Sequence, residues 1–263
     1  VVISAHGSDV RVDCRYRRRP IIWRRIVRTL NEAQAVTAVS GDMRDILTGL
    51  VAERAKVMFI PNGVDLAGFA APVAYRSDWP IEPDRPYILY LGGLTEKKGV
   101  DVLLRAVRLS ETAPQPGLYL VVAGDGRDRE KLEAYVRANG LAGRVRFVGR
   151  VEGDLKRYLL QNCRFVVMPS RTEGMPLVLL EAFASGKPVL ASAAGGLREA
   201  IQDDVTGVLV PPGDVEALAE ALETLWGRDL AAMGAAARAV ARDYAWPAVA
   251  GRYLDLYRAA TRR

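Results

Sequence analysis

Residues 163–181 read CRFVVMPSRTEGMPLVLLE and decide how the surrounding chain folds. The apolar run 163–168 predicts a buried strand. Gly174 and Pro176 disfavour a helix before Leu177, and Pro176 suits the first position of a helix, where its missing N–H costs nothing. A strand, a loop and a helix therefore follow one another here, which is the repeating unit of α/β proteins.

Two carboxylates, Glu173 and Glu181, are attached to this unit. Glu173 falls in the loop above the helix start, and Glu181 falls about one turn inside the helix. Free N–H groups and the dipole at a helix start attract a phosphate, and a carboxylate accepts hydrogen bonds from two neighbouring hydroxyls. The pattern predicts a socket for an anion that also carries hydroxyl groups. On the other interpretation, Glu173 only complements the helix dipole and Glu181 is an exposed helix residue.

Strands and helices alternate regularly from residue 86 onward. The expected strands are 87–91, 118–123, 145–148, 163–168, 189–192 and 208–210. The expected helices lie near 100–109, 127–139, 153–161, 177–184, 197–203 and 215–226, followed by 228–242 and 246–261. This alternation predicts an α/β fold of parallel βαβ units with right-handed crossovers. A Rossmann-like domain is therefore expected over 86–242, with a separate C-terminal helix in 243–263.

The N-terminal part repeats the pattern less completely. Strands are expected at 1–5, 34–39 and 56–60, and helices from residue 20 and at 42–50, the second one capped by Ser40. Residues 1–65 are therefore predicted to form a partial Rossmann-like domain, and 66–85 an interdomain connection. A doubly wound domain usually needs on the order of 100–150 residues, so we expect this domain to lack its first half.

The positive charge of the chain is concentrated near its start. Residues 1–28 carry eight arginines against two aspartates, which accounts for the whole net charge of +6. Apolar residues follow helical spacing from Pro20, with arginines on the other face. The segment 15–28 either packs on the sheet with a solvated face or lies on an anionic membrane surface. Nucleic acid is not an expected partner, because no stacking platform accompanies the charge.

The two cysteines, Cys14 and Cys163, lie far apart in segments of different character. This arrangement favours reduced thiols in a cytoplasmic protein over a disulfide framework. We find no signal peptide and no apolar run of the ~20 residues that a membrane span needs. The sequence therefore predicts a cytoplasmic protein, with peripheral contact to the inner face of the membrane if the basic segment binds lipid.

Five further motifs accompany the 163–181 stretch. They are HGSD at 6–9, IPNGVD at 60–65, KKGV at 97–100, VAGDG at 122–126 and TGVLVPPGD at 206–214. In this order, and with the two glutamates, they resemble the retaining GT-B glycosyltransferases of family 4, also called group 1. The resemblance covers nearly the whole chain. It implies that a sugar moves, with retention, from a UDP- or GDP-sugar to a sugar or lipid-linked acceptor, as in polysaccharide or glycolipid biosynthesis.

The resemblance also implies roles for individual residues. Glu173 would contact the hydroxyls of the transferred sugar, Glu181 the ribose hydroxyls, and Lys98 the diphosphate. His6 would reach the transferred sugar from the N-terminal domain, and the last helix would cross back to that domain. Glu173, His6 and Lys98 are thus the expected catalytic residues.

Further residues would complete the donor site. They are Gly174, Met175, Pro176, Leu177 and Val178 at the helix start, Gly92 and Gly93 after the first strand of the domain, and Arg150 and Val151 beside the base. Gly93 departs from the family pattern, which has an arginine at this position. Either Lys97, Arg171 or Arg198 replaces the missing cation, or the donor is held less tightly. The loop 194–196 with Glu199 either completes the pocket wall or is a plain turn.

No metal and no cofactor are expected. Metal-dependent transferases use an Asp-x-Asp pair, and no two aspartates of this chain lie two residues apart. Side chains and helix dipoles would then neutralise the diphosphate. Two other functions fit the same fold: a non-catalytic module that binds a nucleotide sugar, and a nucleotide-sugar epimerase or a phosphorylase. An epimerase needs acid–base residues, for which one histidine is poor provision.

Overall fold

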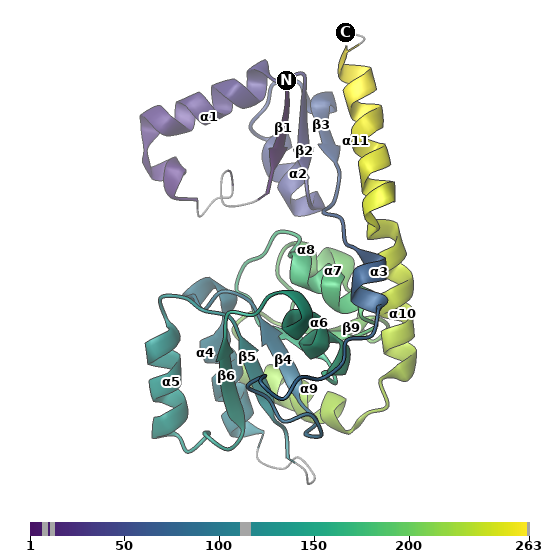
Figure 1. Cartoon of the computed structure of the whole chain (residues 1–263). Coiled ribbons are helices and arrows are strands. Elements are labelled where there is room, and N and C mark those ends of the chain that lie inside the picture. The colour runs from purple at the N-terminus through teal and green to yellow at the C-terminus, as the bar shows by residue number, and fades with distance from the viewer. Residues whose placement is uncertain (7–9, 11–13, 111–116, 262–263) are drawn as a thin grey trace.

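The computed structural model describes residues 1–6, 10, 14–110 and 117–261, and these form two lobes, each built on a parallel sheet (Figure 1). The N-terminal sheet has the order β1-β2-β3, with β1 at Val2–Ala5, β2 at Ala35–Ala38 and β3 at Val57–Phe59. The C-terminal sheet has the order β6-β5-β4-β7-β8-β9. All neighbouring strands in both sheets are parallel, as the alternation predicts.

The elements of the C-terminal lobe lie close to where the sequence places them. Its strands are β4 Ile88–Leu91, β5 Leu120–Ala123, β6 Val145–Gly149, β7 Val166–Met168, β8 Val189–Ser192 and β9 Gly207–Val210. Its helices are η3 Glu96–Lys98, α4 Val100–Leu109, α5 Arg129–Ala138, α6 Gly153–Asn162, α7 Leu177–Ala184, α8 Gly196–Ala200, α9 Val215–Gly227 and α10 Ala231–Ala241. The chain continues through η4 Arg242–Tyr244 into α11 Trp246–Thr261. The predicted order of strands and helices is confirmed.

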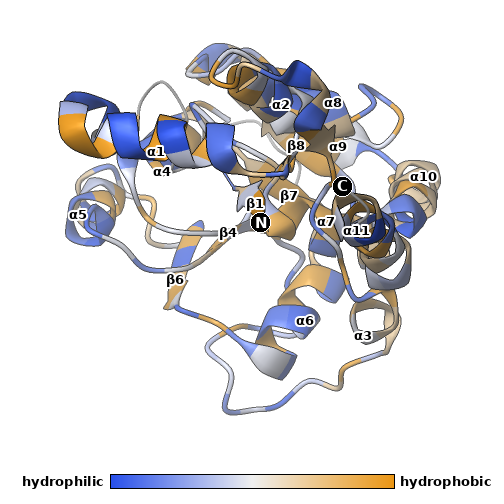
Figure 2. Ribbon diagram, turned by 90° about the horizontal axis from the view of Figure 1, so that it is seen from above, coloured by the Kyte–Doolittle hydropathy of each residue, from blue (hydrophilic) through white to orange (hydrophobic). Residues whose placement is uncertain are grey.

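Both faces of the six-stranded sheet are buried. Along β4, Leu89 packs into one apolar cluster, while Ile88 and Tyr90 pack into another, because successive residues of a strand point to opposite faces. Residues of α6, α7 and α10 contribute to the first cluster, and residues of α4, α5 and α9 to the second. Figure 2 shows apolar residues gathered on β7, β8 and α7, and a largely hydrophilic ribbon at α1. Strands covered on both faces are expected to be apolar throughout.

The N-terminal sheet carries α1 Pro20–Glu32 and α2 Gly41–Thr48. Ser40 caps α2 as predicted, because its Oγ accepts a hydrogen bond from the backbone N–H of Met43 at 3.2 Å. Within α1, Leu30 is buried, whereas Ile21 is 72% exposed. A short helix, η1 Arg15–Arg18, precedes it. The basic helix therefore contacts the core of its lobe through Leu30 and the partly buried Ile26.

Two helices join the lobes. The short α3, Leu66–Ala70, was not predicted; it begins where the Asp65 carboxylate accepts a hydrogen bond from the Gly68 N–H at 3.0 Å. The long α11 runs along the side of the N-terminal lobe (Figure 1). Its Val249 and Leu256 form an apolar cluster with residues of the β2–β3 region. No described helix is long and apolar enough to cross a membrane.

Candidate functional site

The candidate site lies where the strands of the six-stranded sheet end, since ligands of parallel α/β sheets bind at the carboxyl ends of the strands. The loops after β4 and β7 meet there. A Cβ atom at Gly99 would lie 2.0 Å from the carbonyl oxygen of Pro169, and Gly99 has a φ of +68°. A glycine is therefore required at this approach, and it brings Lys98 beside the loop that carries Glu173.

Lys98 and Glu173 form an ion pair in this loop junction. The distance from Lys98 Nζ to Glu173 Oε1 is 2.5 Å, and Ser170 Oγ donates to the same oxygen at 2.9 Å. The side chain of Glu173 is 8% exposed, and that of Lys98 is 34% exposed. Burial and the negative charge of Glu173 raise the pKa of the Tyr90 hydroxyl, which donates to the Gly93 carbonyl at 2.8 Å. The structure thus places two of the expected catalytic residues in contact.

Glu181 lies one turn into α7 and is buried, so the interpretation of an exposed helix residue is wrong. Lys156 of α6 donates from Nζ to Glu181 Oε1 at 2.6 Å. The other oxygen, Oε2, is buried and has no hydrogen-bond partner among the described residues. Sequence reasoning missed Lys156, because a single lysine in the first turn of a helix belongs to no motif.

The start of α7 differs in one detail from the prediction. Pro176 is not the first helical residue but the extended residue before the helix, with φ −72° and ψ 135°, and Leu177 begins α7. Leu177 is 50% exposed, so the helix start is open at this point. The loop is fixed from the other lobe, since Asn62 Nδ2 donates to the Met175 carbonyl at 2.8 Å. Val178 follows in the first turn.

The position of Gly93 is open: the nearest atom to a Cβ placed there would be the carbonyl oxygen of Asp125, at 3.9 Å. Of the proposed replacement cations, Arg171 is already engaged. Its guanidinium donates to both carboxylate oxygens of Asp101, at 2.8 and 2.7 Å, and to the Glu96 carbonyl at 2.5 Å. These contacts brace the loop after β4 against the loop after β7.

His6 follows β1 in the N-terminal lobe and faces the loop after β7. Its carbonyl oxygen would be 3.5 Å from a Cβ at Gly174, which places the two loops opposite each other. Its Nε2 lies 3.2 Å from Ser4 Oγ, and Ser4 Oγ in turn lies 3.2 Å from the hydroxyl of Tyr253 in α11. The ring is therefore held toward α11 in this structure. The rest of the predicted loop, residues 7–9, lies outside the described residues.

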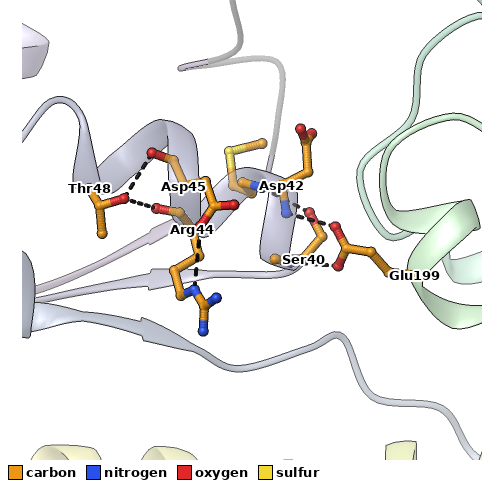
Figure 3. A network of polar contacts seen from close by, with 8 residues as sticks. Ser40, Asp42, Arg44, Asp45, Thr48 and Glu199 are labelled. Carbon is orange, nitrogen blue, oxygen red and sulfur yellow. Dashed lines mark hydrogen bonds and ion pairs between the residues drawn. The ribbon is translucent and has the colours of Figure 1, made fainter.

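Glu199 crosses to the other lobe. Its carboxylate accepts hydrogen bonds from the backbone N–H groups of Gly41 at 2.6 Å and Asp42 at 2.7 Å (Figure 3). Both amides belong to the first turn of α2, where a helix has unpaired N–H groups and a positive dipole end. Glu199 therefore joins the two lobes.

The remaining predicted residues lie at the same end of the sheet. Arg150 follows β6 and binds Glu152, with 2.6 Å between its Nη2 and the Glu152 Oε1, and Val151 is buried. Gly92 follows β4, and its N–H donates to the Ala123 carbonyl at 3.0 Å. Among the described residues, no group of three or more His, Cys, Asp or Glu could hold a metal ion. Both cysteines are buried, and they are not joined in a disulfide.

Comparison with known proteins gives matches along the chain. Residues 74–239 match the family model described as Glycosyl transferases group 1, and residues 1–67 match that of Glycosyltransferase Family 4. The D-inositol 3-phosphate glycosyltransferase of Xylanimonas cellulosilytica is 34% identical over 257 residues, covering 90% of this chain and 61% of that protein.

Two more proteins are similar over almost the whole chain. The GDP-mannose-dependent alpha-(1-6)-phosphatidylinositol monomannoside mannosyltransferase of Mycobacterium tuberculosis is 32% identical over 272 residues, covering 98% of this chain and 69% of that protein. The structure of the sucrose-phosphate synthase from Thermosynechococcus elongatus superposes with a TM-score of 0.80 at 26% identity, covering 98% of this chain and 67% of that one. The chain spans 61% of the length of each of two curated relatives that it matches.

Proposed function

Because the chain belongs to the group 1 glycosyltransferases, we propose that its C-terminal lobe binds a nucleotide diphosphate sugar and that the sugar is transferred with retention and without a metal ion. The fold is of the GT-B type, with two Rossmann-like lobes, as the sequence predicts. The donor site is supported above all by Glu181, whose buried Oε2 has no partner among the described residues. A buried acceptor without a donor is costly, so a ligand hydroxyl at this atom is favourable.

Each residue of the site then has a role. The ribose hydroxyls donate to Glu181 Oε2 while Lys156 holds Oε1. The diphosphate lies near Lys98, whose Nζ is now 2.5 Å from Glu173 Oε1. When Lys98 turns toward phosphate, Glu173 accepts hydrogen bonds from the sugar hydroxyls. The exposed start of α7 at Leu177 adds amide groups and the positive end of the helix dipole.

The proposed reaction needs no protein nucleophile. The acceptor hydroxyl attacks the anomeric carbon on the face that the leaving phosphate occupies. The bond from that carbon to the phosphate oxygen breaks with its electron pair, and the acceptor proton passes to the departing phosphate. The negative charge that develops on the leaving group is stabilised by Lys98 and by the α7 dipole, which are fixed before the reaction begins. His6, on the opposite lobe, is the proposed contact to the transferred sugar.

The acceptor is proposed to be a sugar or a lipid-linked molecule. The names of the two relatives point this way, since one acts on D-inositol 3-phosphate and the other on a phosphatidylinositol monomannoside. The second name also indicates GDP-mannose as a donor. Titration of the chain with UDP and with GDP would identify the base of the donor.

The basic helix α1 is the proposed contact to anionic lipid. Ile21 is 72% exposed and Leu30 is the buried residue of this helix, so apolar surface and arginines both remain outside the lobe. Arg24→Gln with Arg25→Gln should weaken flotation with phosphatidylglycerol vesicles. If the double variant floats as well as the original chain, α1 is a helix with a solvated face.

Calorimetric titration tests the donor site. UDP or GDP should bind with micromolar to millimolar affinity, and Glu181→Gln should weaken binding by about 1.5–3 kcal/mol. Glu173→Gln should weaken a sugar nucleotide far more than the bare diphosphate. Glu220→Gln, which removes an exposed carboxylate on α9, is the matched control. Failure of both nucleotides to bind at millimolar concentration, or equal losses for both ligands in both variants, refutes the assignment.

A non-catalytic nucleotide-sugar-binding module is the alternative function. The ring of His6 turned toward Ser4, with 3.2 Å between His6 Nε2 and Ser4 Oγ, is compatible with it. Donor hydrolysis or transfer by the chain separates the two: turnover that falls in Lys98→Met establishes the enzyme, whereas nucleotide binding without turnover establishes the module.

A further inference from the structure

A second cavity, of about 540 Å³, lies at the opposite end of the six-stranded sheet. It is lined by four cationic side chains, Arg164, Lys187, Arg238 and Arg242, and by glycine, alanine, proline and leucine. No acidic residue is part of this lining. Arg164 and Lys187 lie two residues before the first residues of β7 and β8, while the other two come from α10 and from the start of η4. We call the cavity that these four residues line the basic cavity.

The basic cavity is separate from the donor site. Arg164 lies before β7 and Ser170 lies after it, and six extended residues span roughly 20 Å. The two sites therefore occupy opposite ends of one strand. The α7 helix runs between them, because it begins beside Glu173 and ends at Ser185.

The four cations lack acidic partners. No ion pair joins any of them to a carboxylate in the part of the chain that the structure describes. Arg164 donates from Nη2 to the Arg228 carbonyl at 3.0 Å, and its buried Nε has no partner among the described residues. Arg238 donates from Nη2 to the Ser185 carbonyl at 3.3 Å. Arg164 and Arg238 thus donate to backbone carbonyls, and no carboxylate among the described residues forms an ion pair with any of the four cations.

Four positive charges around one cavity repel one another, which costs free energy. An anion bound in the cavity would attract all four and so make the electrostatic free energy favourable. The volume lies within the roughly 300–1,000 Å³ of small-molecule sites. Arginine and lysine are the side chains that recognise phosphate groups. We propose that the basic cavity binds a phosphate-bearing ligand with at least two negative charges, either a soluble phosphorylated molecule or the headgroup of a phospholipid.

The variant Lys187→Gln with Arg242→Gln tests the proposal without disturbing the fold, because neither side chain makes a hydrogen bond or ion pair to a described residue. Arg105→Gln with Arg137→Gln removes the same two charges from exposed positions on α4 and α5. Tripolyphosphate is the soluble probe, measured by calorimetry. Lys98→Met removes the cation of the proposed donor site, so weaker binding in this variant would show that tripolyphosphate binds there instead.

Tripolyphosphate should bind the original chain, the Arg105/Arg137 variant and the Lys98 variant alike, and at least tenfold more weakly to the Lys187/Arg242 variant. Flotation with vesicles of phosphatidic acid in phosphatidylcholine is the lipid arm: capture lost only in the Lys187/Arg242 variant identifies a headgroup as the source of the phosphate. The proposal is overturned if tripolyphosphate binding is lost in the Lys98 variant and retained in the Lys187/Arg242 variant. It is also overturned by equal behaviour of the two double variants with both probes.

Discussion

The Lys156→Met variant tests whether the buried carboxylate of Glu181 depends on the cation beside it. Lys156 Nζ lies 2.6 Å from Glu181 Oε1, and the two side chains are 27% and 12% exposed. Without Lys156, neither carboxylate oxygen keeps a hydrogen-bond donor among the described residues. A hydrogen bond to a charged group contributes ~1.5–3 kcal/mol, and stranding one partner of a fully buried pair costs ~3–5 kcal/mol. Because Lys156 is partly exposed to water, we expect a loss of about 2 kcal/mol, in the lower range.

Thermal unfolding measures this loss. For chains of this size, 1 kcal/mol corresponds to ~2–4 °C in Tm, so Lys156→Met should unfold about 4–8 °C lower. Lys131→Met, which removes an exposed lysine from α5, should leave the Tm within about one degree. Glu181→Gln and the double variant complete a double-mutant cycle, whose coupling energy should lie between ~0.5 and 3 kcal/mol.

Nucleotide binding distinguishes a structural pair from a pair that serves the donor site. If Lys156 holds Glu181 in place for the ribose, Lys156→Met should weaken UDP or GDP binding as well as lower the Tm. Losses from Lys156→Met and Glu181→Gln that simply add would show that the two side chains are energetically independent, and the reasoning would be refuted. An unchanged Tm in Lys156→Met would have the same consequence.

Three further changes have expected outcomes. Glu199→Ala removes both hydrogen bonds to the first turn of α2, so amide exchange there should quicken and small-angle scattering should show more separated lobes. Arg171, through its hydrogen bonds, lowers the pKa of Asp101 below 3.8; this stabilisation is present above that pH and lost as the pH falls through the lowered pKa. The free energy of unfolding in urea should therefore be lower for Asp101→Asn than for the original chain by under ~1 kcal/mol at neutral pH. This difference should disappear as the pH is lowered. Gly234→Ala places a Cβ 2.4 Å from the Gly186 carbonyl oxygen and should lower the free energy of unfolding by ~1–3 kcal/mol. Its control is Gly251→Ala, where a Cβ has nothing within 4 Å and should raise the free energy of unfolding by up to ~1 kcal/mol.

The strand and helix pattern of the C-terminal lobe could be predicted because its strands are apolar throughout and the apolar residues of its helices recur at helical spacing. The sequence places Lys98 and Glu173 in loops that follow strands, but their ion pair was not predicted, because only the structure shows that β4 and β7 are neighbours. The short α3 could not be predicted, because five residues are too few to show a helical period. Pro176 was placed one residue too far into its helix, which is the usual uncertainty of helix ends.

The contacts of Lys156 and Glu199 could not be predicted from sequence. Lys156 meets Glu181 because α6 and α7 pack side by side on one face of the sheet, and the sequence does not define the angle between them. Glu199 meets α2 because the two lobes close on this side (Figure 3). Both contacts depend on tertiary geometry, whereas a local pattern records only which face of a helix is apolar.

The proposed donor site has two balanced pairs of charged side chains before a ligand arrives. Each of the two glutamates, Glu173 and Glu181, is paired with one lysine, Lys98 or Lys156, so the four side chains carry no net charge. A diphosphate adds negative charge, and the glycine at position 93 supplies no cation to meet it. In the proposed function Lys98 therefore leaves Glu173 for the phosphate, and the carboxylate that it leaves needs new donors. The hydroxyls of the transferred sugar are the donors nearest to hand, so a bare diphosphate should bind less favourably at Glu173 than the complete sugar nucleotide.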